Sequence, residues 1–100
     1  MPRTHFVVVH RPGPEWDHDR GMREQDGWDD HAHFMDELAA DGFIVLGGPI
    51  TGGEHRAMLV CDAPDEAAVR ARLDADPWKP QMLEIESVRR WTVLLEGSAG

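Results

Sequence analysis

The sequence predicts an α+β fold whose elements follow the order β-α-β-β-α-β. Four runs of β-branched and other apolar residues predict strands, and two segments with apolar residues at helical spacing predict helices. A break rich in glycine and proline separates the two middle strands, which are therefore expected to form a hairpin. This order is typical of the ferredoxin-like sandwich, in which strands one and three are antiparallel neighbours and both helices cover one face of the sheet.

The first half of the chain is predicted to contain a strand, a long loop and a helix. Residues 4–10 form a β-branched run that is closed by Pro12-Gly13-Pro14, which predicts a strand. Residues 11–27 are polar and lack periodicity, and a loop of this length in a small domain is more often functional than idle. Between residues 28 and 41 the apolar side chains recur on one helical stripe before a glycine, so this segment predicts an amphipathic helix.

The second half begins with the hairpin and continues into another helix. Residues 43–50 and 55–61 predict the two strands of the hairpin, with a turn at residues 51–53. Pro64 suits the first position of a helix, and acidic residues follow it in the first turn. Residues 64–75 therefore predict the second helix.

The chain is predicted to end in a strand and a short tail. Residues 82–95 predict the last strand, bent near Arg89 and Arg90, and residues 96–100 predict a flexible tail. One hundred residues with 41% hydrophobic content suit one domain with a single core. We therefore expect residues 1–100 to form a single domain.

Charge and cysteine content narrow the classes of partner. Nineteen acidic residues against ten basic residues give a net charge of −9, and an acidic field repels phosphate backbones, so no nucleic-acid partner is expected. No apolar run is long enough for a membrane span, and the N-terminus lacks the apolar core of a signal peptide. The single cysteine, Cys61, excludes an intrachain disulfide and suits the reducing cytoplasm, where we expect the protein to be located.

The predicted strands carry apolar residues at consecutive positions, as in residues 6–9, 43–46 and 58–60. Both faces of the sheet therefore need burial, whereas the two helices cover only one of them. The simplest cover for the other face is a second copy of the chain. The sequence thus predicts a homodimer that packs sheet on sheet.

Helical periodicity singles out one histidine and one aspartate. His31 falls in the middle of the apolar stripe of the first helix, whereas His33 points roughly 160° away. Asp76 lies one helical step beyond the inward Leu73, and antiparallel helices bring His31 and Asp76 to the same end of the sheet. One interpretation is an acid–base pair in which the carboxylate orients the imidazole. The other is a structural hydrogen bond, with Asp76 acting as a turn former before Pro77.

Further side chains are expected to gather at this end of the sheet, roofed by the loop of residues 11–27. The candidates for substrate binding are His10, Arg23, Gly48, Pro49 and Trp78. Arg23 either binds an anionic substrate or pairs with one of the many nearby carboxylates. Trp78 either walls the pocket or belongs to the core.

The sequence gives little reason to expect a metal ion. The rings of His31 and His33 point apart, so shared ligation is not expected. The segment Asp17-His18-Asp19 more commonly forms a solvated acidic turn than a metal site. No cofactor or metal is therefore predicted. The single cysteine, Cys61, is interpreted as an inert core thiol.

At these residues the sequence resembles the YCII-related domain family. The resemblance extends over residues 4–95 and is carried by four segments, REQDGWDDHAHFMDELAADGF, VLGGP, DADPW and LEIESVRRWTV. It implies a ferredoxin-like protomer in a dimeric α+β barrel, with an active site built on one histidine and one aspartate. His31 and Asp76 match that pair, whereas His33 has no counterpart. One characterised relative removes chloride from a chlorinated hydroxyquinol, and muconolactone-isomerase-like proteins share the wider superfamily.

These observations lead to a functional hypothesis. The chain is expected to be a homodimeric, cofactor-free enzyme that acts on a small cyclic or aromatic compound. His31 would be the general acid/base and Asp76 the residue that orients it, in an elimination, an isomerisation or a hydrolysis. The alternatives are a non-catalytic dimer that binds a small ligand and a cofactor-free monooxygenase.

Overall fold

The computed structural model describes residues 3–97, and these form four strands and two helices in the predicted order. The strands and helices are β1 (Arg3–Pro12), α1 (Trp28–Ala40), β2 (Ile44–Ile50), β3 (Arg56–Cys61), α2 (Glu66–Leu73) and β4 (Leu83–Val93). A 3-10 helix, η1 (Met22–Glu24), lies in the loop between β1 and α1. The predicted α+β class is confirmed. In the described part of the chain, neither helix is long and apolar enough to cross a bilayer.

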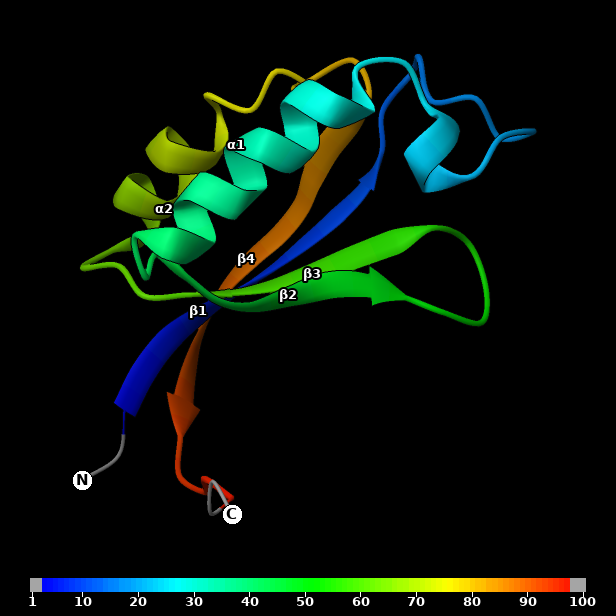
Figure 1. The fold of residues 1–100 in the computed structure, drawn as a ribbon. Coiled ribbons are helices and arrows are strands. Elements are labelled where there is room, and N and C mark those ends of the chain that lie inside the picture. The colour runs from blue at the N-terminus through cyan, green and yellow to red at the C-terminus, as the bar shows by residue number, and fades with distance from the viewer. Residues whose placement is uncertain (1–2, 98–100) are drawn as a thin grey trace.

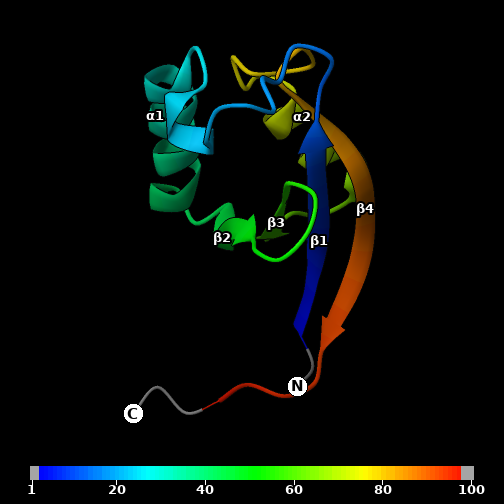
Figure 2. The ribbon, with the colours of Figure 1, turned by 90° about the vertical axis from the view of Figure 1, so that its right-hand side faces the viewer.

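The strands form one antiparallel sheet in the order β2-β3-β1-β4. β1 pairs with β3 on one side and with β4 on the other, so the first and third strands are neighbours as expected. Both helices lie against the same face of this sheet (Figure 1). Seen from the side, α1 lies on one side of the molecule, and β1 and the curved β4 lie on the other (Figure 2).

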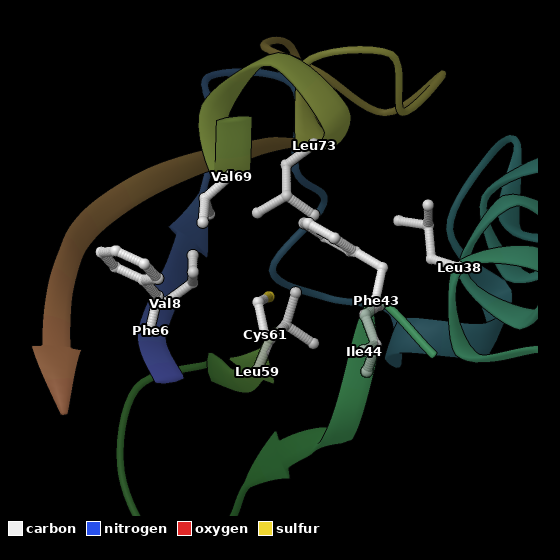
Figure 3. Close-up of a cluster of buried hydrophobic side chains, with 9 residues drawn as sticks. All are labelled: Phe6, Val8, Leu38, Phe43, Ile44, Leu59, Cys61, Val69 and Leu73. Carbon is white, nitrogen blue, oxygen red and sulfur yellow. The ribbon is translucent and has the colours of Figure 1, made fainter. Parts of the chain in front are cut away.

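An apolar core fills the space between the sheet and the two helices (Figure 3). Phe6 and Val8 alternate along β1 and point to the helix-covered face, as the period of two requires. Val69 and Leu73 lie four residues apart on α2 and are both fully buried against these strands. Leu38 of α1 is buried in the same core. Cys61 is also fully buried, and burial raises the pKa of its thiol to about 11, in keeping with an inert thiol.

The opposite face of the sheet has no helix on it. The strand register places Leu46 opposite Val60 and Gly48 opposite Met58 on this open face. Large apolar side chains are exposed on the strands, namely Val45, Leu46, Ile50, Met58 and Trp91. The expectation of an apolar sheet face that the helices leave uncovered therefore agrees with the structure.

The second helix differs from its predicted bounds. It begins after Asp65, whose side chain accepts a hydrogen bond of 2.8 Å from the backbone N–H of Ala68. Asp65 is thus the N-cap, and Pro64 precedes the helix instead of occupying its first turn. The helix ends at Leu73, so Asp76 lies in the following turn and not one step along the helix.

Two smaller expectations also need adjustment. The irregularity in β4 lies between Ile85 and Ser87, opposite the shift between Val9 and His10, because the strands pair without a break at Arg89 and Arg90. Residues 94–97 have no regular structure, whereas residues 98–100 of the predicted tail lie outside the described residues.

Candidate active site

His31 and Asp76 form a buried pair at one end of the helix-covered face. The Nδ1 atom of His31 lies 2.9 and 2.8 Å from the two carboxylate oxygens of Asp76, and the residues are only 7% and 3% exposed. His31 lies in the first turns of α1. Asp76 lies in the turn that follows α2, and its backbone N–H donates a hydrogen bond to the carbonyl of Leu73. Tertiary packing therefore joins two residues that are 45 positions apart.

The partners of Asp76 define the state of the imidazole. An ionised carboxylate only accepts hydrogen bonds, so the Nδ1–H of His31 donates to Asp76. The same carboxylate accepts a bond of 2.9 Å from the backbone N–H of Trp78, which holds it in place. The second ring nitrogen of His31, Nε2, is then the one available to a ligand.

The indole of Trp78 supports the other side of this arrangement. Its ring stacks on the His31 imidazole at 4.0 Å between centroids and 8° between planes. The indole N–H donates to the carbonyl of Asp26, so the same side chain fastens the loop to the site. Gly27 gives the close approach, because a Cβ there would lie 3.2 Å from the indole nitrogen and its φ is +77°. Trp78 belongs to the core behind the imidazole. It is not among the residues that line the cavity described next.

A cavity of about 500 Å³ lies beside His31, between α1, β2 and η1. This volume is within the range of small-molecule sites. Its walls are mainly apolar, and its polar side chains are few. Those polar side chains are His10, Arg23, His31 and Asp36. A purely structural His–Asp pair would not need a pocket beside it.

His10 is the most deeply buried polar residue of the cavity wall. It is 1% exposed, and its Nε2 atom has no hydrogen-bond partner in the described part of the chain. Burial, with help from the nearby charge of Lys79, lowers the pKa of His10 from 6.5 to about 3. His10 is therefore a neutral imidazole at physiological pH. A buried polar atom without a partner is rare and calls for a physical explanation.

The two glycines of β2 have different roles. Gly47 faces Leu59, and a Cβ on Gly47 would lie 2.6 Å from that side chain. Gly47 therefore allows the side chain of Leu59 to pack closely against β2. A Cβ on Gly48 would meet nothing within 4 Å, because this residue faces the open side of the sheet opposite Met58. Gly48 and Pro49 are among the residues that line the cavity, and their role in substrate binding stays a prediction. Gly47 is the glycine of this pair at which a side chain would clash.

The loop that precedes α1 is held in place by Gln25, which the sequence analysis did not single out. The buried Gln25 side chain accepts from the N–H of Asp17 and donates to the carbonyls of Asp17, Arg20 and Gly21. Trp16, in the same loop, packs edge-on against Trp78. A lone glutamine in a polar loop gives no pattern, so only the folded chain identifies its role.

The remaining candidates lie outside the cavity. The side chain of His33 is 76% exposed and pairs with Glu37 on the surface of α1, as its helical phase predicted. Asp17 binds Arg20, and the hydrogen bond from the backbone N–H of Asp19 lowers the pKa of the Asp17 carboxyl. Among the described residues, no three side chains of the usual metal-binding types come together.

Comparison with protein-family models, with curated proteins and with solved structures finds no match to this chain. The resemblance to the YCII-related domain family therefore stays a prediction from the sequence. The chemistry of the site has to be argued from its own residues.

Proposed function

We propose that this protein is a small-molecule enzyme in which His31 acts as the general acid/base and Asp76 orients it. The observation that carries the proposal is the His31–Asp76 pair with its imidazole on the wall of an apolar cavity. A proton-transfer residue needs one ring nitrogen fixed by a partner and the other within reach of the substrate. Asp76 fixes Nδ1, which leaves Nε2 for the substrate.

The reaction classes that this pair serves are elimination, isomerisation and hydrolysis of a small cyclic or aromatic compound. All three need a proton removed from or delivered to the substrate at a fixed position. The carboxylate also stabilises the imidazolium that forms when His31 takes up a proton. This chemistry agrees with the suspected relationship to the YCII-related domain family.

The assembly that we propose is a homodimer of ferredoxin-like protomers, packed sheet on sheet as a dimeric α+β barrel. The exposed apolar side chains of the open face, such as Leu46 and Met58, support it because water-exposed apolar patches favour association. Light scattering at micromolar concentration should report twice the chain mass of 11.2 kDa. A well-folded monomer would remove the barrel from the proposal. The reducing cytoplasm remains the expected location because the chain contains a single buried cysteine.

The function can be tested by following proton transfer in heavy water. Small cyclic ketones, lactones and hydroxyaromatic acids would be incubated with the protein, and both deuterium uptake and turnover would be measured by mass spectrometry. His31→Ala should lower the rate by a factor of about 10²–10⁴, because it removes the acid/base group. Asp76→Asn should lower it less, since an amide still accepts from a neutral ring but does not stabilise a charged one. His33→Ala is the matched control and should keep full activity.

A further inference from the structure

The cavity beside His31 is lined by an arginine, Arg23, that no carboxylate of the described residues neutralises. Arg23 of η1 lines the cavity and is exposed, and it makes no ion pair with any carboxylate of the described residues. Most other arginines do pair with carboxylates, namely Arg11, Arg20, Arg56, Arg70 and Arg72. In a chain with a net charge of −9, an exposed guanidinium that lines a cavity without an ion-pair partner among the described residues is suited to an anionic ligand. The sequence left open whether Arg23 pairs internally, and among the described residues it makes no such pair.

The same cavity offers a second polar group, which is buried. His10 is buried there with an unpartnered Nε2, and a neutral imidazole both donates and accepts hydrogen bonds. The rest of the lining is mainly apolar, with Met35, Leu59 and Leu83 among it. The cavity therefore offers an exposed cation, a buried neutral polar group and an apolar surface.

We propose that this cavity binds a small organic anion that has an acidic group at one end and a hydroxyl or carbonyl group at the other. The acidic group pairs with Arg23, the apolar body lies beside His31, and the neutral polar group bonds to His10. Asp36 of α1 also lines the cavity, and its carboxylate directs the acidic group toward Arg23 by repulsion. The proposal deepens the proposed function because it names the substrate class of the same cavity.

The binding test uses probe compounds that differ in one group at a time. The probes are 3- and 4-hydroxybenzoate, the matching hydroxybenzamides without the charge, and benzoate without the hydroxyl. Binding would be followed by the fluorescence of the tryptophans, since Trp28 lines the cavity. We expect the better of the two hydroxybenzoates to bind roughly fivefold more tightly than its amide, which lacks the ion pair with Arg23. It should also bind roughly fivefold more tightly than benzoate, which lacks the hydrogen bond to His10.

Four variants assign these preferences to residues. Arg23→Gln should abolish the preference for acid over amide, whereas Arg70→Gln makes the same change of charge on α2 and should keep it. His10→Phe should abolish the preference for hydroxybenzoate over benzoate, and His10→Leu, which also lacks a hydrogen-bonding group, would replace it if the phenylalanine variant does not fold. Asp36→Asn should tighten binding of the acids about twofold by removing a repulsive charge.

Two results would overturn the proposal. One is the absence of saturable binding of both hydroxybenzoates at millimolar concentration. The other is an equal effect of Arg23→Gln and Arg70→Gln, which would mean that overall charge and not the cavity controls binding. Binding with these preferences but without turnover would refute only the proposed catalysis. Turnover that is indifferent to Arg23 and His10 would refute only the substrate class.

Discussion

Two parts of the helix-covered sheet face differ in what they bury. Near the start of β1 the buried side chains are apolar, and they pack between the strands and α2 around Phe6 and Leu73. Near the end of β1 the buried set includes His10, Gln25, His31 and Asp76 together with two tryptophans. The first part is stabilised by area removed from water, which tolerates exchange between similar residues. The second depends on individual hydrogen bonds and ring contacts, each of which has a particular partner.

The largest effect is expected in the apolar part. Leu73→Ala should lower the free energy of unfolding by about 3 kcal/mol, because it removes a fully buried side chain and leaves a cavity. Urea unfolding followed by circular dichroism would measure it. Leu95→Ala makes the same chemical change at an exposed position and should cost less than about 0.5 kcal/mol. Equal losses in the two variants would contradict the packing of α2 described above.

The polar part should make stability depend on pH. His10 has a pKa of about 3 in the folded protein but an ordinary value of 6.5 when unfolded, so protons bind preferentially to the unfolded chain below pH 6.5. The contribution of the neutral His10 to the free energy of unfolding is therefore fully present above pH 6.5 and is lost as the pH falls toward 3. Between pH 8 and pH 5 the wild type should lose about 2 kcal/mol more than His10→Phe. Parallel unfolding curves at the two pH values would measure the difference, and identical losses would show that His10 is not buried as a neutral ring.

The loop contributes a smaller amount. Gln25→Ala removes a side chain that makes four hydrogen bonds to the backbone, and water replaces part of them. The free energy of unfolding should fall by about 1.5 kcal/mol. Hydrogen exchange of residues 17–27 should accelerate at the same time. The control is Gln81→Ala, since that side chain is exposed, and faster exchange in both variants would argue against a specific role for Gln25.

The smallest effect is expected on the outer surface of α1. His33→Ala removes an exposed pair with Glu37 and should change the free energy of unfolding by less than about 0.5 kcal/mol. The change should shrink further in high salt, because exposed charges are screened. A larger loss, measured by the same urea unfolding, would mean that His33 has contacts beyond its surface pair.

Much of this site follows from helical periodicity. The apolar stripe of α1 places His31 inward and His33 outward, and the structure agrees for both residues. The antiparallel arrangement of the two helices was expected to bring His31 and Asp76 to one end of the sheet. The two side chains do meet there, although Asp76 lies in a turn and not in the helix. The candidates His10, Arg23, Gly48 and Pro49 all line one cavity. His10, Gly48 and Pro49 share this place because they lie near strand ends, whereas Arg23 reaches it from η1 of the loop. Their roles in binding stay predictions.

The sequence by itself determined the class of the fold and the order of its elements, because hydrophobic spacing and turn residues act over a few positions. Only the tertiary structure decided the contacts that depend on several segments at once. The stacking of Trp78 behind His31, the close approach of Leu59 to Gly47 and the loop contacts of Gln25 belong to this second group. The first two join residues of different elements, and the third depends on the path of an irregular loop, so no periodic spacing in the sequence encodes any of them.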